Sequence, residues 1–328
     1  MSARKWLFVA SCFLSAAFLA AILWRLDWPV FVAEFRRLQY EWLVLTVIFI
    51  VLGIALRSLR WNLATGIPLR AFPAYWNAAV IGLALNHVYP LRAGEIVSII
   101  LLRQMASVPL GQAATSALID RLADALLLGA CAVAVVATHT GLPYAEKLAA
   151  GTLVLACGAL AALIIFAKGH HIWRGWFARW NIKVSLGMQE RLKRFYAGVV
   201  ETAVLIASPF KLTRIVAITV VAFASDFAVV FSATKAFGWE LPLIAPVTVL
   251  VFLAVGTSLP SAPGYAGVYQ IACIFALAFF GIGDSSAVAY SIVLQLCVLG
   301  TIAPLAGLAA FQHSDQMRSA RSDFSKIE

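Results

Sequence analysis

Tyr89-Pro90-Leu91-Arg92-Ala93-Gly94-Glu95 is a charged stretch, broken by proline and glycine, that lies between two apolar runs. Leu259-Pro260-Ser261-Ala262-Pro263-Gly264-Tyr265-Ala266-Gly267 interrupts a later apolar stretch in the same way. Irregular backbone inside a bilayer is tolerated only where protein or a water-filled cavity receives its polar groups. Two such breaks at corresponding places in the two halves of a chain therefore point to a central binding site.

The composition around these breaks is that of an integral membrane protein. Apolar residues make up 62% of the 328 residues and charged residues only 12%, which leaves too little polar surface for a soluble domain. The apolar runs reach about 20 residues, which favours a bundle of helices over an outer-membrane barrel. We expect an all-α, polytopic helical membrane protein, located in the plasma membrane (the inner membrane) of a bacterial cell.

Segments that are apolar enough to span occur near residues 6–24, 41–56, 113–137, 148–167, 213–236 and 286–311. Two further units, 72–102 and 242–282, contain the breaks and are predicted as broken or re-entrant helical hairpins. About six spanning helices plus two hairpins result, and ordinary full-length helices joined by proline-rich loops are the alternative. The first segment is too long for the apolar part of a signal peptide, so we expect an uncleaved anchor.

Basic residues orient the chain. The segment 168–212 is predicted to be cytoplasmic, because eight of the 25 Lys and Arg residues lie between Lys168 and Lys211. Counting spans from it puts the loop 57–70 and both termini, including the tail 312–328, in the cytoplasm. The order of span, hairpin and span over residues 41–137 is then repeated upside down over 213–311. We therefore expect a single transmembrane domain over residues 1–328, built as an inverted repeat.

The net charge of +10 does not require nucleic acid, because positive-inside bias and anionic lipid explain the basic segment. In 168–212, apolar residues recur three and four positions apart beside basic ones, which predicts a helix in the head-group layer. They include Trp173, Trp176, Phe177, Trp180, Leu192, Phe195, Tyr196 and Val199.

Charges inside the predicted spans are the first candidate site residues. Asp120, Arg121 and Asp124 lie within the run 113–137, and each charge at a helix centre costs about 2.5–3.5 kcal/mol in a bilayer. They must therefore face protein, water or one another. Arg121 is within pairing reach of Asp124, so a structural salt bridge and a head-group site both stay open. Arg121 also argues against a divalent ion between the two aspartates.

The first break supplies Arg92 and Glu95. Arg92 has the planar donor fork that suits a lipid phosphate, with Glu95 fixing its orientation, but the two also suit a salt bridge that closes the hairpin. Asn86 and His87 precede the break and offer further donors, although a lone histidine is more often a hydrogen-bonded structural group.

The second break lacks charge. Pro263, Gly264 and Gly267 leave backbone groups free, and a following helix would present its positive dipole end to a head group. Gln270 could hydrogen-bond the same ligand. Asp226, inside the run 213–236, is either a buried neutral acid or a proton-coupling group.

Motifs for catalysis and metal binding are lacking. The chain has no HExxH, GxSxG, P-loop or Cys/His pattern, and its five cysteines lie in apolar stretches. We expect no catalytic residue, no metal and no cofactor, and a transporter more than an enzyme.

The motifs place the chain beside a known family. With Pro90-Leu91-Arg92-Ala93-Gly94-Glu95, then Ile119-Asp120-Arg121-Leu122-Ala123-Asp124, and the late proline- and glycine-rich stretch 259–268, it resembles the flippase-like transmembrane region of the lysylphosphatidylglycerol synthases over about residues 10–312. The late motif of that family usually reads Pro-Gly-Gly-Leu-Gly, and this chain departs from it at Tyr265 and Ala266. The resemblance implies a stand-alone member without the soluble synthase domain, because the chain stops at Glu328, so lysyl transfer from tRNA is not expected.

The resemblance implies a protein that handles lipids. We expect a translocase that moves a phospholipid, an aminoacylated lipid or an isoprenoid or hopanoid lipid across or within the plasma membrane. Two alternatives stay open: a membrane-embedded transferase acting on a lipid phosphate, and a noncatalytic membrane partner of a lipid-modifying enzyme. The expected partners are membrane lipids, anionic or isoprenoid, with a lipid-modifying enzyme as a further candidate and no nucleic acid.

Overall fold

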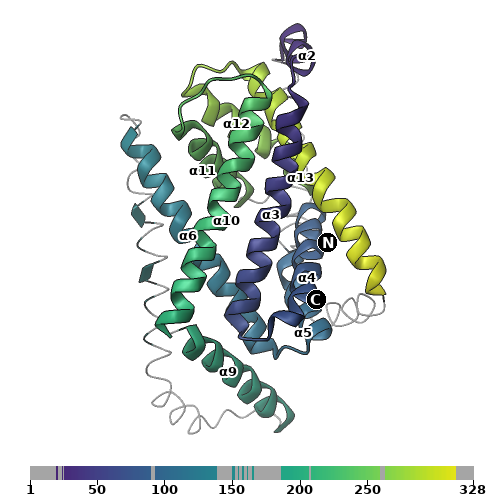
Figure 1. Cartoon of the computed structure of the whole chain (residues 1–328), viewed down its shortest axis with the longest axis vertical. Coiled ribbons are helices and arrows are strands. Elements are labelled where there is room, and N and C mark those ends of the chain that lie inside the picture. The colour runs from purple at the N-terminus through teal and green to yellow at the C-terminus, as the bar shows by residue number, and fades with distance from the viewer. Residues whose placement is uncertain are drawn as a thin grey trace.

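A computed structural model describes residues 26–89, 93–138, 186–206, 208–258 and 263–314, with single positions before residue 26 and between 150 and 165. Within these ranges all regular structure is helical, which confirms the expected all-α class. Figure 1 shows the helices gathered into one elongated bundle.

Four of the described helices are long and apolar enough to cross a membrane. They are α3 (Tyr40–Thr65), α6 (Leu110–Thr138), α10 (Pro209–Ala236) and α13 (Asp284–Gln312). At 1.5 Å per residue each is about 40 Å long, more than the hydrocarbon core of about 30 Å. They coincide with four of the predicted spans. The other two, 6–24 and 148–167, lie outside the described residues apart from single positions.

Both predicted hairpins are present. The first consists of α4 (Phe72–Val88), reached through the short turn η1 (Leu69–Ala71), and α5 (Ala93–Ala106). The second consists of α11 (Ile244–Ser258) and α12 (Val268–Ala278), with the single turn η3 (Pro263–Tyr265) at its tip. Helices of 11 to 17 residues are about 17–25 Å long, which is shorter than the hydrocarbon core and fits re-entrant hairpins.

The two halves are related as an inverted repeat. Helices α3 and α10 run antiparallel and side by side, since the Gln39 N–H donates to the Ala236 carbonyl (2.9 Å) and the hydroxyls of Thr46 and Ser232 lie 2.8 Å apart. The hairpin α4–α5 lies toward one end of the bundle and α11–α12 toward the other (Figure 1). Each hairpin also packs against the last helix of the opposite half, α4 on α13 and α11 on α6.

Helix α3 extends well beyond the predicted end of its span at residue 56. It stops at Gly66, which has the left-handed backbone (φ 71°) that commonly ends helices. The added two turns pack against the first hairpin, where Trp61 and Tyr75 are buried edge to face, with ring centroids 5.7 Å apart. Residues 57–65, which hydropathy predicts as part of a loop, therefore belong to α3 and contribute to the bundle interior.

The remaining described helices lie at the two ends of the bundle. α2 (Trp28–Arg36) is at one end, and α9 (Leu186–Ile206) is at the other, beside α6 (Figure 1). A methyl group on Gly111 of α6 would come within 2.0 Å of the Phe195 carbonyl, so the two helices touch closely. The exposed side chains of Leu192 and Phe195 fit the predicted head-group-layer helix. Its first part, with Trp173 to Trp180, lies outside the described residues.

Candidate functional site

Arg60 is the most buried charge in the described part of the bundle. Its side chain is 1% exposed, and its Nε and Nη2 lie 2.5 Å and 2.8 Å from carboxylate oxygens of Asp120 and Asp124 on α6. Nη1 donates to the Thr219 hydroxyl on α10 at 3.0 Å. One guanidinium thus joins α3, α6 and α10, and every branch of its donor fork is in use.

Arg57, one turn earlier on α3, makes a second set of ion pairs. Its Nη1 donates to Asp226 Oδ1 on α10 at 3.0 Å and its Nη2 to Oδ2, while its Nε lies 3.8 Å from Asp124 Oδ2. The structure therefore holds Asp226 in an ion pair, where the sequence left a neutral acid and a proton-coupling group equally open. Asp124 is shared by both arginines.

Arg121 forms an ion pair with the first hairpin. Its Nη2 lies 3.0 Å from Glu95 Oε1 on α5, and no ion pair to Asp124 joins it among the described residues. Successive residues of a helix are rotated by about 100°, so Asp120 and Asp124 face α3 while Arg121 faces the hairpin. The sequence left open a salt bridge between Arg121 and Asp124 within α6, whereas the structure pairs Arg121 with Glu95 of α5.

Gly94 explains how Glu95 reaches this position. A Cβ at Gly94 would lie 2.1 Å from the Gly82 carbonyl and 2.7 Å from Asn86 Oδ1, so only glycine lets α5 approach α4 this closely. Gly94 is the second residue of α5 as described, Ala93–Ala106, so this contact lies in the first described turn of the helix. Close contact of the two hairpin helices fixes the direction in which Glu95 leaves the backbone.

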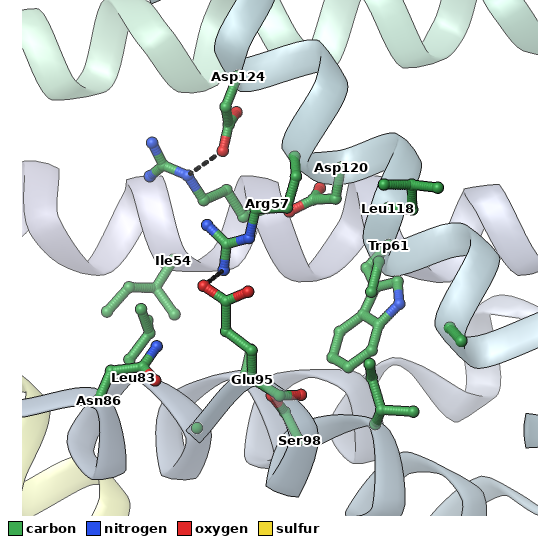
Figure 2. A pocket seen from close by; sticks show the side chains of 16 residues that line it. Ile54, Arg57, Trp61, Leu83, Asn86, Glu95, Ser98, Leu118, Asp120 and Asp124 are labelled. Atoms are coloured by element: carbon green, nitrogen blue, oxygen red, sulfur yellow. Dashed lines mark hydrogen bonds and ion pairs between the residues drawn. The ribbon is translucent and has the colours of Figure 1, made fainter. Parts of the chain in front are cut away.

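A cavity of about 470 Å³ lies between α3, α4, α5 and α6, and its charged lining residues are Arg57, Glu95, Asp120, Arg121 and Asp124. Figure 2 shows Asn86, Glu95 and Ser98 on one side of it and Asp120 and Asp124 on the other. The remaining lining is mostly apolar: Ile54, Trp61, Ala79, Leu83, Ile99, Ala114, Ala117 and Leu118. The volume lies in the range of small-molecule sites, and the mixture of walls suits a ligand that is polar at one end and apolar at the other.

The charges compensate one another. An unpaired charge at the centre of a membrane helix costs about 2.5–3.5 kcal/mol, and leaving one member of a buried pair alone costs about 3–5 kcal/mol. Here each of Arg57, Arg60 and Arg121 has at least one carboxylate within 4 Å. The network can therefore persist in the bilayer, and a ligand can enter it by exchanging one ionic partner for another.

The structure gathers most of the predicted first-half residues at this cavity. Asn86, Glu95, Asp120, Arg121 and Asp124 all line it. Arg92, the predicted phosphate-binding residue, lies outside the described residues together with Pro90 and Leu91.

The sequence prediction missed Arg57 and Arg60 by assigning them to a cytoplasmic loop. Two signals were present: the two arginines are three residues apart, hence on one helix face, and nothing breaks the helix before Gly66.

The described part of the second tip, residues 263–267, is held by the side chains of Gln270 and Gln295. Gln270 Oε1 accepts from the Gly267 N–H (2.8 Å) and its Nε2 donates to Gln295 Oε1 on α13 (2.8 Å). Gln295 Nε2 donates to the Gly264 carbonyl. Gly264, Tyr265 and Gly267 all have positive φ, at 74°, 58° and 83°, and η3 starts at Pro263. Tyr265 is thus a non-glycine residue in a left-handed conformation, at the position where the late motif usually has glycine.

The tips of the two hairpins meet. The rings of His87, at the end of α4, and Tyr265 in η3 are in edge-to-face contact with centroids 5.2 Å apart. The His87 Nδ1 lies 2.9 Å from the Leu83 carbonyl within its own helix, which is the structural arrangement expected of a lone histidine. The end of α4 and the turn η3 of the second hairpin are therefore in contact.

The same bridge occurs once in each half. Glu95 is the third residue of α5 and pairs with Arg121, the twelfth residue of α6. Gln270 is the third residue of α12 and bonds to Gln295, the twelfth residue of α13. Each bridge ties a hairpin to the long helix that follows it. The bridge is ionic in the first half and neutral in the second.

Comparison with models of known protein families gave a match. Residues 8–306 match the family described as the lysylphosphatidylglycerol synthase TM region. Neither a search of curated proteins nor a search of solved structures gave a match.

Proposed function

Because the chain belongs to the lysylphosphatidylglycerol synthase transmembrane-region family, it is a lipid-related membrane protein, and we propose that it moves lipid across or within the membrane. The observation that carries the proposal is the charged cavity between α3, the first hairpin and α6. Lipid transport requires a site for a polar head group inside the membrane bundle, whereas a bundle with a purely structural role has no need of one.

The cavity has walls for both parts of a lipid. Its charged residues, among them Arg57, Glu95 and Asp124, receive the head group, and its apolar residues receive the start of the chains. Leu118 lines the cavity and is 52% exposed, so this wall borders the outer surface of α6. Acyl chains can then stay in the bilayer while the head group lies inside.

Asp124 is the residue best placed for a first test. It is the carboxylate shared by Arg57 and Arg60, and those arginines keep Asp226 and Asp120 when it is neutralised. Asp124→Asn therefore changes the charge of the cavity with little disturbance of the fold. Glu240, which pairs with Lys235 at 2.7 Å and is 86% exposed, supplies a matched control in Glu240→Gln.

The test is the movement of a fluorescent phosphatidylglycerol between the leaflets of sealed proteoliposomes, read by chemical quenching of the outer leaflet. We expect protein-dependent movement that falls about tenfold in Asp124→Asn, because the hydroxyls of the phosphatidylglycerol head group lose the charged carboxylate that accepts from them. Movement is unchanged in Glu240→Gln. Equal rates in wild type and Asp124→Asn would reject the cavity as the transport site.

The same preparations separate the alternatives. A transferase forms product in detergent and depends on a divalent ion, whereas transport needs a closed bilayer. A partner subunit loses its synthase when the segment 168–212 is removed, and its cavity variants behave like wild type. Arg92 as a phosphate ligand, the plasma membrane and the cytoplasmic termini stay predictions; loss of movement in Arg92→Ala is the test of the first.

A further inference from the structure

The fold does not require charge at the bridge between Glu95 and Arg121. In the second half the equivalent bridge is made by the amides of Gln270 and Gln295 at 2.8 Å, and it holds the second hairpin to α13. Charged groups are much more costly than amides inside a membrane. Two charges at a position where two amides suffice therefore call for a role beyond holding the hairpin.

Arg121 is the more exposed of the two arginines that line the cavity, and Arg60 lies buried behind them. The side chain of Arg121 is 46% exposed, against 31% for Arg57 and 1% for Arg60. Arg60 uses its whole donor fork on Asp120, Asp124 and Thr219, and Arg57 uses both terminal nitrogens on Asp226. Among the described residues Arg121 forms its ion pair through Nη2 alone, so part of its fork is open to the cavity.

We infer that Glu95 and Arg121 form an exchangeable pair, in which Arg121 leaves the carboxylate of Glu95 to bind the phosphate of a lipid head group. This inference rests on the proposed lipid transport and names the residue that reads the head group. The guanidinium fork matches a phosphate with two parallel N–H···O bonds, which a single carboxylate oxygen at 3.0 Å does not offer. Glu95 is then the group that occupies Arg121 while the cavity is empty.

If the pair exchanges, two variants change the affinity for phosphate in opposite directions. Glu95→Gln removes the competitor for Arg121, so phosphate binding becomes tighter. The double variant Glu95→Gln, Arg121→Gln removes the phosphate ligand, so binding becomes weaker. It also reproduces the neutral bridge of the second half, which is why we expect it to fold. A bridge that only holds the hairpin predicts no change of binding in either variant.

The experiment measures the affinity of the purified full-length chain in detergent for dioleoylphosphatidylglycerol, from the rise of the unfolding midpoint with lipid concentration. Dioleoylglycerol, the same lipid without phosphate, is the control ligand, and Glu240→Gln is the control variant. We expect about threefold tighter binding for Glu95→Gln, because more of the protein has Arg121 free. The double variant binds about tenfold more weakly, and dioleoylglycerol binding is the same throughout.

Three results would overturn parts of this account separately. Unchanged phospholipid affinity in both variants, with wild-type binding and transport intact, would reject the exchange and leave the proposed function standing. Wild-type protein that neither binds nor moves phospholipid would reject both. Glycerol 3-phosphate that binds as tightly as the lipid would make the ligand a soluble phosphate ester, which keeps the role of Arg121 and contradicts lipid transport.

Discussion

The two halves of the protein hold their hairpins by the same bridge and differ in what surrounds it. In the first half the bridge of Glu95 and Arg121 borders a charged cavity of about 470 Å³. In the second half the bridge of Gln270 and Gln295 closes on the backbone of its own tip, at Gly264 and Gly267. The repeat therefore supplies one scaffold twice, and the chemistry is concentrated in one copy.

The two halves also differ in their packing: the interior beside the second hairpin is aromatic, and the interior beside the first is charged. Around the second hairpin the rings of Phe237, Trp239 and Tyr290 contact one another, with ring centroids 4.9–5.6 Å apart. Tyr290 is fully buried there. In the first half the corresponding interior contains arginines and carboxylates beside the cavity. The second half thus has the features of a support that positions its tip against the first.

The largest expected effect comes from removing the central charge of the first half. Arg60→Met leaves Asp120 and Asp124 without their shared partner, and we expect a loss of about 3–5 kcal/mol of stability. The unfolding midpoint and the yield of monodisperse protein report it. In the triple variant Arg60→Met, Asp120→Asn, Asp124→Asn no unpaired charge is left from these ion pairs. We expect it to recover stability but not transport. A single Arg60→Met variant as stable as wild type would show that the ion pairs do not hold the half together.

Glycines at the two hairpin crossings sharpen the comparison next. Gly94→Ala puts a Cβ 2.1 Å from a backbone carbonyl, whereas at Gly256 of α11 the nearest atoms are side-chain carbons of Val268 and Ala272, at 3.2 Å and 3.3 Å. We expect Gly94→Ala to cost about 3 kcal/mol and Gly256→Ala about 1 kcal/mol or less. Thermal unfolding of both, beside Gly300→Ala with nothing within 4 Å, measures the difference. Equal midpoints for the first two would contradict the close crossing of α4 and α5.

Gln270→Ala tests the neutral bridge. It removes the acceptor for the Gly267 N–H and the bond to Gln295, which we expect to cost about 1–2 kcal/mol of stability. Thermal unfolding gives the cost. A loss like that of Arg60→Met would mean that the second half depends on its bridge as strongly as the first depends on its charges.

The smallest effect concerns the backbone of the second tip. Tyr265 has φ 58° and its ring touches His87. Tyr265→Ala loses the ring contact and keeps the left-handed conformation, whereas Tyr265→Gly loses the contact and relieves the backbone. We expect the glycine variant to be about 1 kcal/mol more stable than the alanine variant. The same midpoint for both would show that this residue is not held in a left-handed conformation.

The sequence predicts the architecture well because its signals are strong ones. Proline and glycine inside apolar runs can only be tolerated at sheltered breaks, and the basic loops require the second half to be inverted. The cost of Asp120 and Asp124 in a membrane likewise marks them as interior groups. The free-energy cost of placing a charge or an unpaired backbone group in the hydrocarbon core is large, so these predictions do not depend on the packing of individual side chains.

The partners of those groups were harder to predict. Arg57 and Arg60 directly follow the apolar run, so hydropathy alone predicts that the helix ends before them. The helix in fact continues to Thr65 and is stopped by Gly66. The matched bridges were also hidden, since Glu95 and Gln270 correspond only when the first residues of α5 and α12 are known. Contacts between helices depend on rotation about each axis, which one sequence does not specify.

The most direct measurement of the central claim compares the two halves in one transport assay. Leaflet-to-leaflet movement of phosphatidylglycerol is measured in sealed vesicles with equal amounts of wild type, Asp124→Asn and Gln270→Ala. The account predicts about tenfold slower movement for Asp124→Asn and movement within about threefold of wild type for Gln270→Ala. Transport that survives in Asp124→Asn, or that fails equally in both variants, would contradict it.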